Sequence, residues 1–395
     1  MMNIELEKKI KSVEPEVIEW FHYLHEHPEL GFEEFGTADF VEKTLKSFSN
    51  IKVLRLGKTG VLGILHTKRP GRTVAFRADM DALPIKENPN HRICSKNEGV
   101  MHACGHDGHT ATLLGAAKIL SEMADILCGE IRFVFQPSEE VQPGGAKSMV
   151  EHGALEGADY IFGLHYSTDA KPGYFAVHPG INFAANYMFD MLLTGKEGHA
   201  AFPHLASDTV LAAAELVQAL QHIVPRSVDP LSSAVLSVTR IHGGKVYNTL
   251  PSRVKLGGTI RYLDWSEHSV ITRRIDEIGY GIASAYHCGF SWKLTEGCEP
   301  LYNEPELTAK VRRILEKNYG ASQILDNAPV MGCEDFSEYL KTTKGVYYRV
   351  GARSEEPDGY VYPTHNSGFV LNEKALVYGV GSIINILMEF TKTEE

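Results

Sequence analysis

The stretch MHACGHDGHTATLLGAAKILSEMADILCGEIRFVFQPSEE, residues 101–140, predicts a loop, a helix and a strand in that order. A loop rich in histidine and glycine leads into the alanine- and leucine-rich segment Thr110–Ala124, which predicts a helix. The apolar run Ile131–Gln136 predicts a strand, and the acidic pair Glu139-Glu140 follows it closely. Polar residues just beyond a strand are typical of α/β proteins, which bind ligands at that edge of the sheet.

The surrounding sequence continues this alternation of helices and strands. Residues 4–23 predict an amphipathic helix, and short apolar runs predict strands at 61–65, 73–77 and 160–164. A helix at 305–318, a strand at 346–350 and a helix at 372–390 are predicted towards the end of the chain. We therefore expect an α/β fold in which helices cover a mostly parallel sheet.

A second pattern occupies the middle of the chain. It consists of a strand (187–193), a helix (207–224), two strands (234–241 and 254–262), a helix (266–286) and a strand (290–294). This β-α-β-β-α-β order is that of a ferredoxin-like α+β sandwich. We therefore predict a discontinuous catalytic domain, residues 1–185 and 299–395, with an α+β domain inserted at residues 186–298.

Composition excludes several classes of protein. The 395 residues include 39 Lys and Arg against 50 Asp and Glu, a net charge of −11, and no run of five basic residues, so no nucleic-acid partner is expected. No apolar run approaches the roughly 20 residues of a membrane span, and the charged start lacks a signal-like apolar core, so we expect a cytoplasmic protein without a membrane partner. Six irregularly spaced cysteines predict free thiols or metal ligands.

Two sites within residues 101–140 could carry chemistry. Cys104 and His106 stand two residues apart beside glycines, so both could face one metal ion; the alternative is a histidine-rich helix cap with a buried free cysteine. At Glu139-Glu140, one carboxylate could bind a cation while the other accepts a proton from water; the alternative is a solvated turn.

Further candidates follow other predicted strands. His165 ends the strand at 160–164, and His365 lies in a polar loop before the last helix, although either could be an ordinary hydrogen-bonded histidine. Asp79 and Asp81 would point to one face of an extended segment, where one could support a ligand histidine; the alternative is a turn before Pro84. Taken jointly, Cys104, His106, Glu140, His165 and His365 could bind two cations that share a water, which leaves Glu139 as a spare acid.

The motifs HACGHDGHTA, FQPSEE, GLH, GHAAFPH (198–204), NTLPS (248–252) and THNSGF occur in order along the chain. They resemble peptidase family M20, the two-metal metallopeptidases of aminoacylase and carboxypeptidase type. More narrowly, they resemble its amidohydrolase branch of hippurate hydrolases, N-acyl amino acid deacylases and auxin-conjugate hydrolases. The resemblance runs from HEHPEL (25–30) to the final helix.

The resemblance implies a site with two divalent metal ions per subunit, zinc or manganese, with nickel or cobalt as alternatives. It implies Glu139 as general base and Asp81 as its supporting acid. The implied metal ligands are Cys104, His106, Glu140, His165 and His365. The chain departs from the commoner family pattern at Asp79, where that pattern has a ligand histidine, and near Cys104, which replaces a bridging aspartate.

The resemblance also implies a homodimer formed through the inserted domain, which then serves as a dimerisation or lid domain. His199 would reach the active site of the partner subunit and hydrogen-bond the developing oxyanion. Arg261, near the end of a predicted strand, could pair with a substrate α-carboxylate, and Asn248 could add a hydrogen bond. The alternative for Arg261 is an ordinary surface residue.

The expected activity is metal-dependent hydrolysis of the amide bond of N-acyl amino acids, acetyl or aroyl, by metal-activated water with a glutamate general base. A dipeptidase or carboxypeptidase of the same family is the first alternative. The others are a thiol enzyme in which Cys104 pairs with His106 or His109, and a non-catalytic scaffold that holds metal. A purely structural site would not need the extra acid at Glu139.

Overall fold

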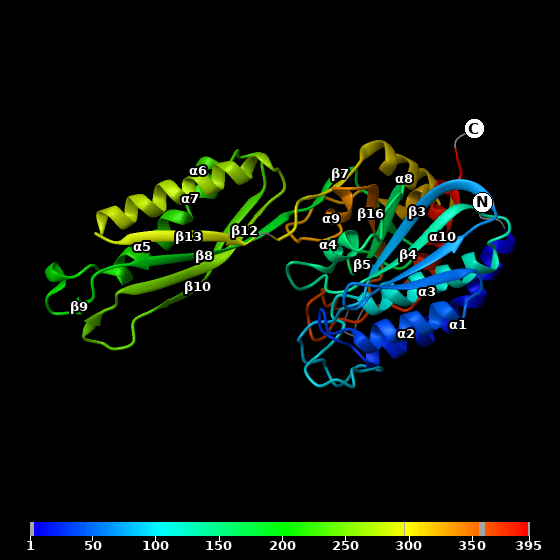
Figure 1. Ribbon diagram of the computed structural model, residues 1–395, viewed down its shortest axis with the longest axis horizontal. Coiled ribbons are helices and arrows are strands. Elements are labelled where there is room, and N and C mark those ends of the chain that lie inside the picture. The colour runs from blue at the N-terminus through cyan, green and yellow to red at the C-terminus, as the bar shows by residue number, and fades with distance from the viewer. Residues whose placement is uncertain (1–3, 296, 355–359, 394–395) are drawn as a thin grey trace. The chain divides into compact units, whose positions relative to one another are not determined.

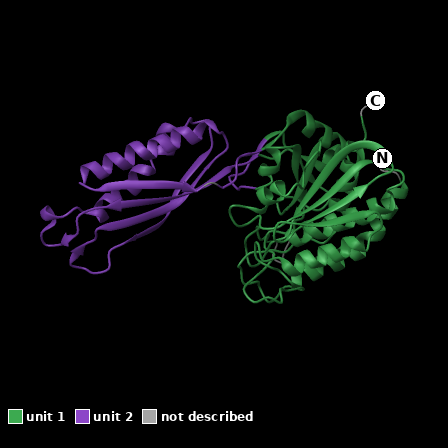
Figure 2. Cartoon of the chain, in the orientation of Figure 1, with its two compact units in different colours: residues 1–180, 302–328, 335–395 green, residues 181–301, 329–334 purple. Residues whose placement is uncertain are grey.

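The computed structural model describes residues 4–295, 297–354 and 360–393. The chain forms two compact units, Met1–Gly180 with Tyr302–Ala328 and Asp335–Glu395, and Ile181–Leu301 with Pro329–Glu334 (Figure 2). Residues 329–334, which we had assigned to the catalytic domain, thus group with the second unit. The reason is backbone pairing: Val330 N donates to Asn182 O at 3.0 Å, and Ala184 N donates to Gly332 O at 2.9 Å.

The first unit is built on an eight-stranded sheet in the order β1-β2-β4-β3-β5-β16-β6-β15. Its centre is parallel, since β3 pairs with β4 and β5 in that sense and β16 pairs with β5, whereas β1, β2 and β6 add antiparallel pairs. The strands are β1 (Ile51–Leu56), β2 (Gly60–His66), β3 (Arg69–Asp79), β4 (Cys128–Gln136), β5 (Tyr160–Ser167), β6 (Phe175–Ala176), β15 (Ile324–Leu325) and β16 (Lys344–Gly351).

Helices lie on both faces of this sheet (Figure 1). On one face, α1, α3 and α10 pack together, and Phe162 of β5 contacts Phe390 of α10 at 4.7 Å between ring centroids. On the other face, Tyr347 of β16 contacts Phe336, next to α9, at 4.9 Å. The helices are α1 (Ile4–Glu26), α2 (Phe35–Lys46), α3 (His106–Glu122), α4 (Gly145–Glu151), α8 (Pro305–Tyr319), α9 (Ser337–Leu340) and α10 (Lys374–Phe390).

The helix α3 begins four residues earlier than predicted. Gly105 precedes it in the left-handed region, with φ of 88°, and His109 N already donates to Gly105 O at 3.0 Å. His106 and His109 therefore stand three residues apart in the first turn, on one side of the helix. Further along, Gly115 allows α3 to approach α1 closely, because a Cβ there would lie 2.5 Å from Val17.

The second unit has a four-stranded antiparallel sheet in the order β10-β12-β8-β13, with two long segments of helix, as a ferredoxin-like sandwich requires. Its main elements are β8 (Ala185–Thr194), α5 (Thr209–Leu220), α6 (Ile223–Ser227), β10 (Ala234–Gly243), β12 (Arg253–Tyr262), α7 (Ser266–Ala285) and β13 (Gly289–Thr295). The helix predicted at 207–224 is interrupted, because Pro225 cannot donate to Gln221 O and its ring would clash there.

The predicted fold class is confirmed: a large, mostly parallel sheet with covering helices, and an inserted ferredoxin-like unit. The second unit also contains a small hairpin of β9 (Gly198–His199) and β11 (Thr249–Leu250). Short strands β7 (Gly180–Phe183) and β14 (Leu301–Asn303) lie where the chain passes between the units. Among the described residues, no helix has the length and apolar character that crossing a membrane demands.

Candidate active site

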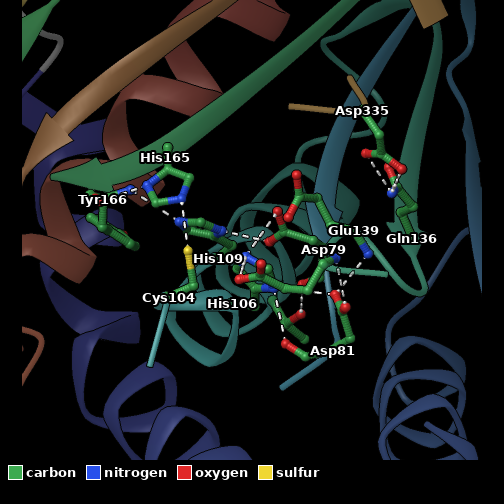
Figure 3. Close-up of polar contacts among 12 residues, drawn as sticks. Asp79, Asp81, Cys104, His106, His109, Gln136, Glu139, His165, Tyr166 and Asp335 are labelled. Atoms are coloured by element: carbon green, nitrogen blue, oxygen red, sulfur yellow. Dashed lines mark hydrogen bonds and ion pairs between the residues drawn. The ribbon is translucent and has the colours of Figure 1, made fainter. Parts of the chain in front are cut away.

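The carboxylate of Asp81 organises the acidic pair that follows β4 (Figure 3). Its two oxygens accept from the backbone N–H groups of Glu139 and Glu140, each at 3.0 Å. The same residue contacts His106, whose Nδ1 lies 2.9 Å from the Asp81 carbonyl and 3.2 Å from Oδ1. Asp81 thus connects the first turn of α3 with the turn that carries both glutamates.

Backbone groups fix the tautomers of two histidines. His106 Nδ1 faces the Asp81 carbonyl, and His165 Nδ1 faces the Tyr166 carbonyl at 2.6 Å; since a carbonyl only accepts, both Nδ1 atoms carry hydrogen. Since Nδ1 keeps its hydrogen, Nε2 is in each ring the nitrogen at which a metal ion can replace a proton. This is the arrangement that metal-binding histidines need, in which one nitrogen is hydrogen-bonded and the other is directed at the ion.

These Nε2 atoms meet other donors suited to a metal ion. Cys104 Sγ lies 3.3 Å from His165 Nε2, and the donor atoms of Cys104, His106 and His165 lie within 4.8 Å of one another. His365 Nε2 lies 3.0 Å from Glu140 Oε1, and these two residues form a second such group with Cys104. The structure therefore brings all five predicted ligands together in two groups that share Cys104.

Burial supports a cation at this position. His106 Nε2 is buried and has no hydrogen-bond partner among the described residues. Burial lowers the pKa of His106, but the carboxylates of Asp79 and Asp81 more than offset this and raise it to about 10, so the surroundings favour positive charge at this ring. A buried nitrogen, a thiol and a carboxylate are the donor set that zinc and other borderline divalent ions bind. The residues present thus fit the predicted metal ions.

The electrostatics of Cys104 argue against the thiol-enzyme alternative. Burial, and then the nearby carboxylates of Glu140 and Glu139, raise the pKa of the Cys104 thiol well above its ordinary value. A cysteine nucleophile needs the opposite shift, towards a stable thiolate. Without a cation beside it Cys104 remains a thiol, which favours a metal ligand over a nucleophile.

A buried network behind the site was not predicted from the sequence. Arg77 donates to Asp79 at 2.6 Å, to Asp335 at 2.9 Å and to Gln136 at 2.7 Å, and its side chain is fully buried. Asp79, which stands where the commoner family pattern has a ligand histidine, lies 2.5 Å from His109 Nδ1. Asp79 is therefore paired with the Arg77 guanidinium and with the His109 imidazole.

His109 extends this network to a predicted ligand. Its Nε2 accepts from Tyr166 N at 3.0 Å, so its Nδ1 carries the hydrogen that faces Asp79. The Tyr166 carbonyl in turn holds His165. Both nitrogens of His109 are used, so His109 supports the site and is unsuited to the role of base that the thiol-enzyme alternative gave it.

The three remaining predicted residues lie in the second unit. His199 is exposed on β9, and its Nδ1 accepts from Ala201 N at 3.1 Å, which leaves Nε2 as the hydrogen-bearing nitrogen of the neutral ring. Asn248 is exposed, and its backbone carbonyl accepts from Ala200 N at 2.9 Å. Arg261 on β12 is half-buried and donates from Nη1 to Met331 O at 2.8 Å.

Comparison with known proteins identifies the family. Residues 75–389 match peptidase family M20/M25/M40. The chain is 38% identical over 378 residues to thermostable carboxypeptidase 1 of Saccharolobus solfataricus, and the matched residues cover 95% of both chains. It is 44% identical over 306 residues to an N-acyl-L-amino acid amidohydrolase of Geobacillus stearothermophilus, which covers 78% of this chain and 83% of the relative.

A solved structure agrees with this match. A dinuclear metal-binding peptidase of the M20 family from Bacillus subtilis superposes with a TM-score of 0.84 at 29% identity, covering 97% of this chain and 99% of the other. Of the motifs that suggested the family, HACGHDGHTA, FQPSEE, GLH and THNSGF contribute the side chains that the first unit gathers around Cys104 and Glu140. The chain therefore belongs to peptidase family M20/M25/M40, as a hydrolase of its amidohydrolase branch.

Proposed function

We propose that this protein hydrolyses the amide bond of N-acyl amino acids, with an acetyl or aroyl acyl group, at the site around Cys104, His106, Glu140, His165 and His365. The observation that carries the proposal is the presence of Glu139 beside two groups of metal-binding side chains. Glu139, Glu140 and His106 offer donor atoms within 4.8 Å of one another, which supports a role for this acid beside two of the proposed ligands. The relative at 44% identity, named as an N-acyl-L-amino acid amidohydrolase, supports this substrate class.

The five donors would hold two divalent ions, zinc or manganese. When bound, such ions lower the pKa of a water molecule and polarise an acyl carbonyl. Glu139 would take a proton from the attacking water and return it to the amine that leaves. Asp81 would keep Glu139 in place through the backbone bond to its N–H, at 3.0 Å.

We further propose that Arg261 and Asn248 recognise the free α-carboxylate of the substrate. Arg261 uses Nη1 for Met331 O, and a guanidinium has five N–H groups in all, so the planar fork retains donors for a carboxylate. Amino acid amides that lack this negative charge should then be poor substrates. Equal turnover of the acid and amide forms would disprove this assignment.

His199 is proposed to act in the partner subunit of a homodimer. Because its Nδ1 accepts from Ala201 N, its Nε2 is the nitrogen that carries the hydrogen that a donor to an oxyanion needs, and the second unit has the edge strands β10 and β13 for pairing. Loss of one such donor typically costs about 10²–10³ in kcat. Activity should reappear when His199→Ala and Glu139→Gln subunits are mixed, because a mixed dimer holds one complete site; verified exchange without recovery would refute the partner role.

A second candidate function is that of a carboxypeptidase. The relatives at 38% identity carry that name and cover 95% of both chains, so peptide substrates belong in the same test. The chemistry at the site would be the same. Only the acyl side of the scissile bond would differ, an amino acid residue in place of an acetyl or aroyl group.

The test is a hydrolysis screen of N-acetyl and N-benzoyl amino acids against dipeptides, with protein stripped by EDTA and reloaded with Zn²⁺ or Mn²⁺. We expect the stripped protein to be inactive, the reloaded protein to be active, and N-acyl amino acids to be cleaved faster than peptides. Faster cleavage of peptides would favour the carboxypeptidase. Full activity after verified metal removal would reject both metal-dependent functions and would favour the alternative in which Cys104 is the nucleophile.

A further inference from the structure

A buried carboxylate, Glu34, lies behind the turn that carries the two glutamates. It stands at the residue before α2, the position whose side chain usually caps a helix, but it makes no capping hydrogen bond to α2. Glu29 caps α2 instead, since its oxygens accept from Gly36 N at 3.0 Å and Thr37 N at 2.7 Å. The Glu34 side chain is therefore directed elsewhere.

Its partners show where it is directed. Glu34 Oε1 accepts from Ser138 N at 2.8 Å and from Phe32 N at 2.9 Å, and Oε2 accepts from Thr59 Oγ1 at 2.7 Å. Ser138 immediately precedes Glu139. Together with the two bonds to Asp81, three consecutive backbone N–H groups, from Ser138 to Glu140, donate to two buried carboxylates.

The turn that receives this bond has an unfavourable backbone conformation. Ser138 has φ of +48°, in the left-handed region that non-glycine residues seldom adopt. The segment before Glu34 packs tightly on the turn, because a Cβ on Gly31 would lie 2.7 Å from Ser138 Oγ. On the other side, Ser138 O accepts from Gly145 N at 2.8 Å. Hydrogen bonds thus hold Ser138 on both sides, and Glu34 accepts one of these bonds.

The position is costly for a carboxylate. Glu34 has no exposed surface, and its three described donors are all neutral groups. Burial raises the pKa of Glu34, the Asp81 carboxylate raises it further, and the bonds from Thr59 and the backbone oppose both effects. A buried acid beside another acid is an unfavourable choice if only packing matters. This argues for a specific use of its acceptor oxygens.

We propose that Glu34 is a positioning residue for Glu139, which it holds in place by accepting from Ser138 N. The inference rests on the proposed function, since Glu139 is the general base of that proposal. Glu34 need not touch substrate or metal. Its effect is to keep the turn at residues 138–140 in the one conformation that presents Glu139 and Glu140 to the site.

Three substitutions test the proposal. Glu34→Ala removes the acceptor, and a misplacement of about 1 Å can cost roughly 10²-fold in rate, so we expect kcat to fall roughly 10- to 100-fold with KM nearly unchanged. Glu34→Gln keeps an oxygen for Ser138 N and should retain most of the activity. Glu29→Ala is the matched control, because Glu29 is a nearby acid whose side-chain hydrogen bonds, among the described residues, go to Gly36 and Thr37 of α2.

Amide hydrogen exchange of the segment 137–145, followed by mass spectrometry, gives a readout that does not depend on activity. Protection there should fall in Glu34→Ala and persist in Glu34→Gln and Glu29→Ala. If Glu34→Ala does not fold, Glu34→Asp takes its place, since it keeps the charge but shortens the reach to Ser138.

The outcomes separate this inference from the proposed function. Inactive wild-type protein across the substrate screen would defeat the proposed function, and the exchange data would still decide whether Glu34 holds the turn. Active wild-type protein with an equally active and equally protected Glu34→Ala would overturn the inference. An equal loss in Glu29→Ala or in Glu34→Gln would also overturn it, because the bond to Ser138 would then not be the cause.

Discussion

Replacement of Asp81 by asparagine isolates what its second oxygen contributes. The side chain is fully buried, and its two oxygens accept from Glu139 N and Glu140 N, each at 3.0 Å. Asparagine has almost the same shape but offers one oxygen and one NH₂ group. Whichever way the amide lies, one of the two backbone N–H groups will face a donor in place of an acceptor.

The size of the effect follows from that lost pair. A buried polar group left without a partner costs about 1–3 kcal/mol, and a bond to a charged acceptor is among the stronger ones. We therefore expect Asp81→Asn to lower the free energy of unfolding by about 1–3 kcal/mol. If the transition state loses the same free energy, kcat should fall by roughly 5- to 150-fold, since about 1.4 kcal/mol corresponds to a factor of ten.

The assay combines steady-state kinetics on an N-acyl amino acid, urea denaturation and elemental analysis of bound metal. We expect a lower kcat and lower stability, with metal still present because none of the five ligands is changed. The reasoning would be refuted by a variant with kcat within about twofold of wild type. It would be refuted equally by a variant that loses all its metal, since the contacts of Asp81 with His106 and Glu140 would then outweigh its effect on Glu139.

Three further predictions concern single residues. Glu139→Gln should retain metal and lose about 10²–10⁴ in rate, because it removes the proton acceptor; activity within a few-fold of wild type would rule out this base. Cys104→Ser should lower both metal content and activity in elemental analysis and kinetics, and unchanged values would exclude the thiol as a ligand. His25 lies 2.7 Å from Asp107 and 2.9 Å from Glu87, and although burial lowers its pKa, these acids raise it from 6.5 to about 10. A raised histidine pKa stabilises the fold fully below pH 6.5 and loses that effect as the pH rises towards 10, so the unfolding free energy should fall more steeply over this interval in wild type than in His25→Gln; identical slopes would contradict the reasoning.

The sequence predicted the parts of the site that are local. Cys104 and His106 are two residues apart, and Glu139 and Glu140 follow a strand directly, so spacing and strand ends were enough to nominate them. The alternation of strands and helices likewise predicted the sheet and the inserted unit. The alanine- and leucine-rich pattern placed the start of α3 at Thr110 and left the residues before it as a loop or a helix start; the helix begins at His106, directly after Gly105 with φ of 88°.

The supporting residues could not be predicted because they depend on contacts between distant segments. Arg77 and Asp335 are 258 residues apart in sequence, and Glu34 and Ser138 are 104 apart. Nothing in the local pattern around either acid distinguishes it from a surface residue. Asp335 is buried and accepts from Gln136 and Ala146 N, which only the folded chain reveals.

The return of residues 329–334 to the second unit has a consequence for protein engineering. That unit is formed by two separate stretches of chain, so excision of residues 181–301 alone would leave the Pro329–Glu334 segment without the backbone partners at Asn182 and Ala184. The next residue, Asp335, is the one that binds Arg77 beneath the site. A minimal catalytic core, or a chimera with another inserted unit, must therefore replace both stretches. It must also keep Asp335 where it accepts from Arg77 of β3.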